Sequence, residues 1–164
     1  MKKTLFAAAL AALTALPAFA HDYRVGDLVI DHPWARETTP MARATGGFMT
    51  ITNTGAEDDR LLAARSDAAD MTQIHITVQD GDVMRMMEQT DGIVIPAGGS
   101  VEFRPGSYHV MFMGIAAPFV EGEERSATLV FERAGEVEIL FAVEAMGGGE
   151  MHQHGDPSGH GMSN

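Results

Sequence analysis

The sequence predicts an all-β protein, an antiparallel sandwich or barrel, and three observations favour this class. Short runs rich in Val, Ile, Thr and Phe recur along the chain after residue 20. Gly, Pro, Asn and Asp separate these runs, as turn residues separate strands. No long segment in this part of the chain shows the 3.6-residue periodicity of an amphipathic helix. Many short strands with regular turn signals are typical of sandwiches and barrels.

Each strand is expected where a β-rich run lies between two turn signals. We expect strands at 25–31, 47–53, 60–66, 73–79, 83–88, 100–103, 108–113, 126–131 and 137–143. Turn residues lie between runs at 53–55, 80–81, 96–99, 105–106 and 134–135. The segment 116–125 has no such run, and we expect a loop there.

The two ends of the chain differ from the middle. Residues 1–20 are typical of a secretory signal peptide: Lys2 and Lys3, an apolar stretch, and a small-x-small site that would be cleaved after Ala20. The apolar stretch is too short to span a bilayer, and no later one is long enough. Residues 21–146 are expected to form one domain, followed by a disordered Met/His-rich tail at 147–164.

Charge and composition exclude several classes of function. After the signal, nine arginines face 23 acidic residues, a formal charge of −14. Such a chain would be repelled by nucleic acid and by anionic membranes. There is no cysteine, which excludes disulfides, thiolate nucleophiles and blue-copper sites. No nucleophile elbow, zinc-protease motif or phosphate-binding loop is present, so we expect no enzyme.

A hairpin at 73–88 carries the first pair of candidate metal ligands. A type I′ turn at Asp80-Gly81 would place His75 directly opposite Met86. Because side chains alternate along a strand, His75 points away from the face that carries Ile74 and Ile76.

The second pair lies on the run 108–113. Period two puts Tyr108, Val110 and Phe112 on one face, and His109, Met111 and Met113 on the other. If this strand approaches the hairpin, His75, Met86, His109 and Met111 provide two imidazoles and two thioethers. Thioethers favour the soft ion Cu(I) over harder divalent ions, so Cu(I) is the expected metal.

Taken singly, each of these residues fits ordinary packing better than metal binding, because Met is a common core filler. Two His-Met pairs on the faces opposite apolar stripes favour the metal site. The roles of Met84, Met87 and Met113 stay open between core, site rim and spare ligand.

At this point the chain resembles the periplasmic copper chaperones called PCu(A)C, whose signature is H-x10-M-x21-H-x-M. His75 and Met86 have the required ten intervening residues, whereas Met86 and His109 have 22, one more than the signature. With Met87 in place of Met86, the spacing to His109 would match the signature but the spacing from His75 would not. We therefore expect one inserted residue, relative to the signature, near 87–91. Further similar segments are 31–36, 81–86, 95–99 and 105–109, and the resemblance covers about residues 25–145.

The resemblance implies a cupredoxin-like sandwich that delivers Cu(I) to the Cu(A) centre of cytochrome c oxidase subunit II, alongside a Sco-type protein, in the periplasm. It also implies an accessory copper site in the tail, where Cu(II) could bind as well. The candidate tail ligands are Met151, His152, His154, His160 and Met162.

Three alternatives stay open. His21, at the expected mature terminus, offers an amine and an imidazole, half of the histidine brace of a copper monooxygenase. A copper storage or resistance protein would use the same ligand types. A metal-free sandwich for adhesion or assembly would show no effect of metal on its stability.

Overall fold

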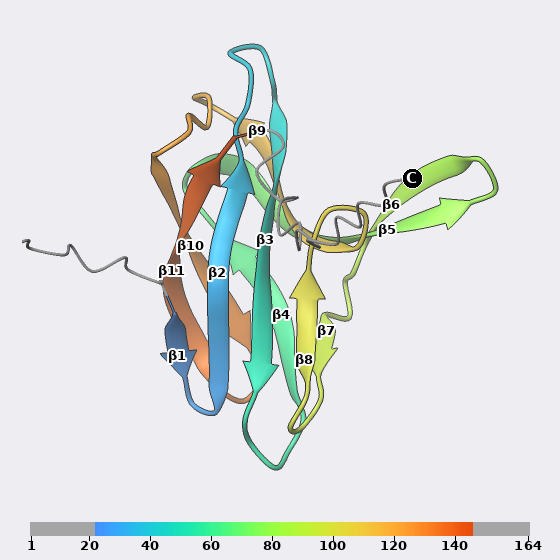
Figure 1. The fold of residues 1–164 in the computed structure, drawn as a ribbon, viewed down its shortest axis with the longest axis vertical. Helices are drawn as coiled ribbons and strands as arrows, with labels where there is room; N and C mark the ends of the chain where they lie inside the picture. The colour runs from blue at the N-terminus through green and yellow to red at the C-terminus, as the bar shows by residue number, and fades with distance from the viewer. Residues whose placement is uncertain (1–21, 146–164) are drawn as a thin grey trace, which may run out of the picture.

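The computed structural model describes residues 22–145, which form eleven β-strands and, within that range, no helix that could span a membrane. The predicted all-β sandwich is confirmed (Figure 1). The strands are β1 (Tyr23–Val25), β2 (Leu28–Arg36), β3 (Ala44–Asn53), β4 (Asp59–Arg65), β5 (Ala69–Asp80), β6 (Val83–Glu88), β7 (Ile93–Ile95), β8 (Ser100–Phe103), β9 (Tyr108–Ile115), β10 (Glu124–Phe131) and β11 (Gly135–Glu144).

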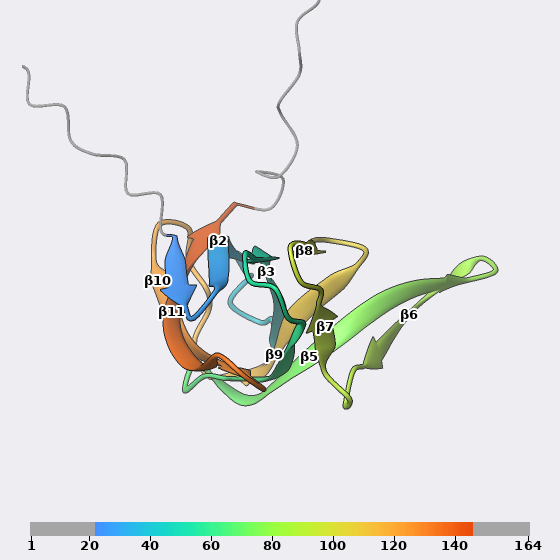
Figure 2. The same cartoon turned by 90° about the horizontal axis from the view of Figure 1, so that it is seen from below.

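The strands form one continuous sheet that folds over itself. Its order is β6-β5-β9-β8-β3-β2-β11-β10-β4-β7, with β1 beside β2, and β9 also pairs with β3. Strands β2, β3 and β8 form the near layer in Figure 1 and β4 and β10 lie behind them, while Figure 2 shows the two layers from below. Most pairs are antiparallel, as predicted, but β2 with β11 and β8 with β9 pair in parallel.

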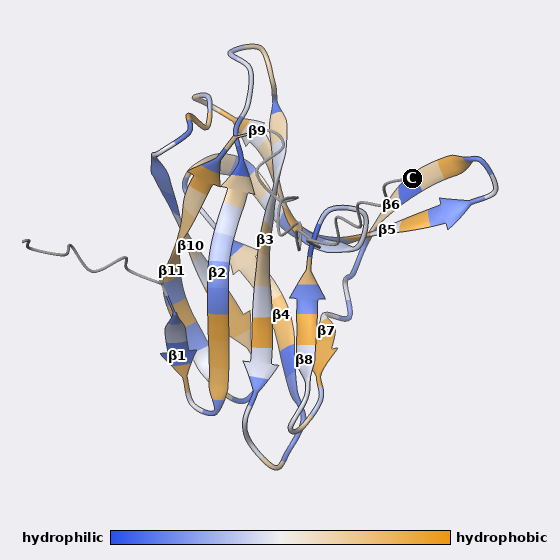
Figure 3. Cartoon of the chain, in the orientation of Figure 1, coloured by the Kyte–Doolittle hydropathy of each residue, from blue (hydrophilic) through white to orange (hydrophobic). Residues whose placement is uncertain are grey.

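Aromatic side chains fill the space between the layers. The ring of Phe112 lies 5.4 Å from that of Phe119 and 5.6 Å from that of Phe141, centroid to centroid. All three are fully buried. Strand β3 passes close to this cluster at Gly47, where a Cβ atom would lie 2.9 Å from both Phe112 and Phe141. Figure 3 shows apolar and polar bands along the strands.

The hairpin of β5 and β6 projects from the sandwich (Figures 1 and 2). Its turn differs from the prediction. Asp80 pairs with Val83, so the two turn residues are Gly81 and Asp82. Gly81 has φ +63°, and Asp82 is not among the residues with positive φ. Glycine at the first central position is the type II′ pattern, whereas type I′ needs positive φ at both positions.

The type II′ turn moves the register by two residues relative to the prediction. His75 pairs with Glu88, and Met86 pairs with Thr77. The expected direct pairing of His75 with Met86 is therefore wrong. Because the shift is an even number of residues, Met84 and Met86 stay on the same face as His75.

Other elements differ from the prediction mainly in length. The three-residue strands β1 and β7 were not expected, and β2 continues to Arg36 across a bulge between Asp31 and Trp34. His32 occupies this bulge with φ +46°, and its Nε2 lies 3.0 Å from Oε1 of Glu144. The signal peptide, His21 and the tail lie outside the described residues.

Candidate metal centre

The two histidines of the predicted site are cross-strand neighbours. Strand β5 pairs with β9 in a register that sets His75 opposite His109, and their ring centroids are 5.8 Å apart. The same register sets Gln73 opposite Met111. Apolar residues on the other face, such as Ile74 and Val110, are buried in the core, and this burial fixes which face the histidines occupy.

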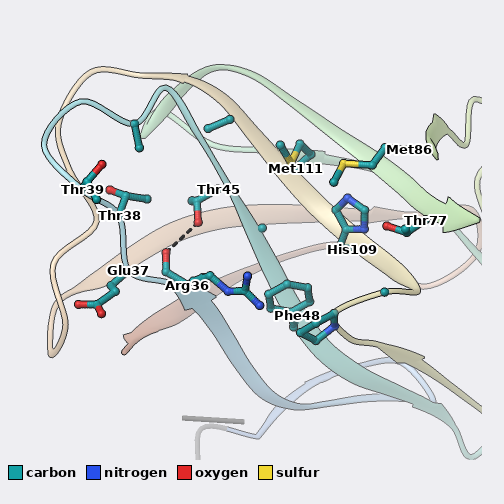
Figure 4. Close-up of a pocket in the computed structure, with 15 residues that line it drawn as sticks. Arg36, Glu37, Thr38, Thr39, Thr45, Phe48, Thr77, Met86, His109 and Met111 are labelled. Atoms are coloured by element: carbon teal, nitrogen blue, oxygen red, sulfur yellow. Dashed lines mark hydrogen bonds between the residues drawn. The ribbon is translucent and has the colours of Figure 1, made fainter. Parts of the chain in front are cut away.

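Met86 joins this group from the hairpin. Met86, Thr77, His109 and Met111 line one open pocket of about 380 Å³. Figure 4 shows the two thioethers beside each other and next to the ring of His109. Met86 is diagonal to His75 across the β5–β6 pair, a separation of about 7–8 Å between backbones that a long, flexible Met side chain can bridge.

Hydrogen bonding fixes which nitrogen of His109 carries its proton. Nδ1 of His109 lies 3.0 Å from the carbonyl oxygen of Ser107. A carbonyl can only accept, so Nδ1 donates and Nε2 keeps a free lone pair. His109 is 4% exposed, and within the described residues its buried Nε2 has no hydrogen-bond partner.

His75 is arranged in the complementary way. Its Nε2 donates to Oε1 of Gln73 at 3.0 Å. Its Nδ1 is buried and has no partner in the described part of the chain. Leaving a buried polar atom unpaired costs about 1–3 kcal/mol. In metal-binding histidines one ring nitrogen holds the metal and the other donates a hydrogen bond that orients the ring, and both His75 and His109 fit this pattern.

The surroundings favour a neutral His75. Burial away from water lowers the pKa of His75 below its ordinary value, and the neighbouring His109 lowers it further. Glu88, opposite His75 on β6, partly offsets this lowering. A ring that stays neutral keeps its lone pair available to a metal.

The pocket has an aromatic wall and a polar rim. The ring of Phe48 lies 6.4 Å from that of His109 and is backed by Trp34, whose ring centroid is 4.5 Å away. Arg36, Thr38 and Thr39 add polar side chains to the lining. His32 takes no part, since its ring is 71% exposed and bonds to Glu144.

The donors gathered here are neutral nitrogen and sulfur atoms. Among residues 22–145 no three side chains of His, Cys, Asp or Glu gather around a common point. None of the four candidate donors is a carboxylate, the ligand that harder ions prefer, although Glu88 faces His75 from β6. Two imidazoles with two thioethers suit a soft monovalent ion.

The structure separates Met86 from Met87. Met87 pairs with Ile76, on the face opposite the histidines, and does not line the pocket. The sequence analysis did not assign a role to Gln73, although its position two residues before His75 on the same strand face was a usable signal. The carbonyl of Ser107 carries no side-chain signal and could not have been found that way. The tail residues Met151, His152, His154, His160 and Met162 lie outside the described part.

Comparison with known families gives one match over most of the described chain. The family model described as "Putative lipoprotein LpqE-like" matches residues 28–143. Among curated proteins, the "Putative lipoprotein Lxx21020" of Leifsonia xyli subsp. xyli is 32% identical over 111 residues, which are 68% of this chain and 67% of that protein.

Solved structures are similar over the same region. The copper-bound PCuAC domain from PmoF2 is 33% identical, with a TM-score of 0.65, over 77% of this chain and 99% of that domain. The apo PCuAC domain from PmoF1 is 27% identical, with a TM-score of 0.66, over 77% of this chain and 100% of that domain.

Proposed function

Because this chain belongs to the LpqE-like family of PCu(A)C domains, we propose that it is an exported copper chaperone. Its cargo is Cu(I), held by His75, Met86, His109 and Met111. One observation carries the proposal: Nδ1 of His75 and Nε2 of His109 are buried on adjacent strands with no partner among the described residues, and His109 shares a pocket with the thioethers of Met86 and Met111.

The ligand set suits transport of the monovalent ion. Imidazole binds several metals, but thioethers add affinity for Cu(I) and little for Zn²⁺ or Ca²⁺. The likeness to a copper-bound PCuAC domain from PmoF2 supports copper as the metal. Four protein ligands also fill a tetrahedral site, whereas catalytic metal sites keep one position open for water or substrate. This favours carriage over catalysis.

Delivery requires that a partner can reach the ion. Met86 is 61% exposed at the projecting hairpin, whereas His109 is buried. On this proposal the recipient is the Cu(A) centre of cytochrome c oxidase subunit II, a Sco-type protein acts alongside, and the compartment is the periplasm. The family resemblance and the lipoprotein name of the Leifsonia relative support export.

The test is an anaerobic Cu(I) titration of the full chain, followed by X-ray absorption at one equivalent of copper. We expect two sulfur and two nitrogen scatterers. Met86→Leu and Met111→Leu should each remove one sulfur and weaken binding at least about tenfold, about 1.4 kcal/mol. Met87→Leu is the matched control, because Met87 adjoins Met86 and is 53% exposed on the other face.

Unchanged sulfur scattering in both Leu variants would refute the ligand assignment. Transfer is measured separately, by mixing the Cu(I)-loaded chain with the apo copper domain of oxidase subunit II. A chaperone loses its copper to that domain, whereas a storage protein retains it.

A further inference from the structure

Three methionines continue the outer face of the β5–β9 pair beyond the histidines. Met71 pairs directly with Met113, and Met111 lies two residues before Met113 on the same strand face. Directly opposed side chains have Cβ atoms about 4.5–5.5 Å apart. Same-face neighbours along one strand are about 6.5 Å apart. Three flexible thioethers therefore start within reach of a common point.

The sheet keeps these methionines out of the core. On the inner face of the same strands, Ile74, Val110 and Phe112 are buried. Met71 is 53% exposed, and Met111 and Met113 are half-buried. Met71 is therefore not a core residue, because more than half of its surface stays accessible to water.

Small residues face the thioethers from the other side of β9. Strand β3 places Ala44 opposite Met113 and Gly46 opposite Met111. Neither has a side chain long enough to cover the sulfur atoms, although the ring of Phe48 lies over Gly46. The group is also continuous with the main site, since Met111 lines the same pocket as Met86 and His109.

We propose that Met71, Met111 and Met113 form a second Cu(I) position made of three thioethers, which adjoins the histidine site and shares Met111 with it. Thioethers alone bind Cu(I) and discriminate against harder ions. This position is weaker than the first, because it lacks imidazole and is more exposed. The shared ligand lets the ion pass between the two positions by exchanging one ligand at a time. The inference rests on the proposed function, in that the main site takes Cu(I).

The test follows each methionine separately. Full-length protein labelled with ¹³C at the methionine methyl groups is titrated with Ag(I), a soft, redox-inert stand-in for Cu(I), and single Met→Leu variants assign the signals. We expect the Met86 and Met111 signals to shift during the first equivalent. The Met71 and Met113 signals should shift together afterwards. Met41, which is 87% exposed on the loop between β2 and β3, is the control and should not follow them.

Variants then separate the two positions. Met71→Leu and Met113→Leu conserve side-chain volume. Each should abolish the later shift of the remaining partner, weaken the second step at least tenfold and leave the first step unchanged. Met41→Leu should change neither step.

Static Met71 and Met113 signals, together with shifting Met86 and Met111 signals, would overturn this inference and leave the proposed function intact. Static Met86 and Met111 signals would instead refute the proposed function.

Discussion

At the scale of single residues, the state of the ring nitrogens distinguishes the site from ordinary surface histidines. Each of the two rings has one nitrogen held by a hydrogen bond, to Ser107 or to Gln73, and one buried nitrogen without a described partner. The hydrogen bonds orient the lone pairs before any ion arrives. Removing a residue that orients a ligand in this way typically lowers metal affinity by about 10–100-fold.

Gln73 provides the first prediction. Gln73→Ala removes the acceptor for Nε2 of His75, so the ring can rotate or bind through the wrong nitrogen. We expect Cu(I) affinity to fall about tenfold, measured by competition with a chromophoric Cu(I) chelator. Gln79→Ala is the control, because Gln79 lies on the same face of β5 but bonds to Gly81 in the turn. Equal losses in the two variants would contradict an orienting role for Gln73.

The lowered pKa of His75 predicts a pH dependence of the metal-free protein. The unfolded chain takes up a proton at His75 near the ordinary pKa of 6.5, whereas the folded chain does so at lower pH. Between these two pKa values the unfolded state binds more protons, so the free energy of unfolding falls as pH decreases through this window. Denaturant melts of the wild type and His75→Gln across pH 4–8 measure the effect. The wild type should lose more stability below about pH 6.5, and parallel curves would be evidence against the shift.

At the scale of elements, the hairpin determines whether Met86 reaches the histidines. All six residues of β6 are exposed, and in the described structure β6 pairs only with β5. The strand therefore depends on its own turn for its register, and the turn depends on the positive φ of Gly81.

Gly81→Ala tests this dependence. An L-residue at that φ costs about 1–2 kcal/mol, so amide exchange along β6 should accelerate by roughly 5–30-fold and Cu(I) affinity should fall. Gly98→Ala is a matched control: Gly98 has φ +64°, a Cβ there would also meet nothing within 4 Å, and it lies in the loop before β8. Hydrogen exchange followed by NMR distinguishes the two. If both variants accelerate β6 equally, the effect is not local to the hairpin.

The sequence predicted β6 and β8 with the bounds that the structure shows, and β9 and β10 to within two residues at one end. Strands β1 and β7 were missed because three residues are too few to show a period. The sequence predicted correctly which face of the sheet each site residue on β5, β6 and β9 occupies. Side chains alternate with a period of two, so a register shift of two residues leaves every side chain on the same face. The register itself did not follow, because Asp80-Gly81-Asp82 is compatible with glycine at either central position of a turn.

At the scale of the whole molecule, the core and the site occupy opposite faces of the same strands. Phe112 points into the aromatic core, while its neighbours Met111 and Met113 point outward. The sequence could predict both faces of β9. The sequence could not predict that β5 pairs with β9, and the proposed site was made conditional on that pairing. Pairing between strands distant in sequence leaves no local pattern.

Gly47→Ala should affect the core face of the sheet and not the site face. The new Cβ would lie 2.9 Å from the rings of Phe112 and Phe141, and overpacking of this kind costs about 1–3 kcal/mol. We expect a lower free energy of unfolding in urea with Cu(I) affinity changed less than about threefold. A variant that keeps its stability but loses copper would show that the core and the site are not independent.

The ligands of the site differ in how firmly the fold holds them. The imidazoles lie on two internal strands, and His109 is almost fully buried, whereas Met86 lies on an exposed edge strand. On the proposed function, this gives unloading a direction. The thioether on the hairpin is the first bond that a recipient can displace, and the buried nitrogen of His109 is the last to release. The recipient would then approach over the hairpin, and the emptied rings would remain in position for the next ion.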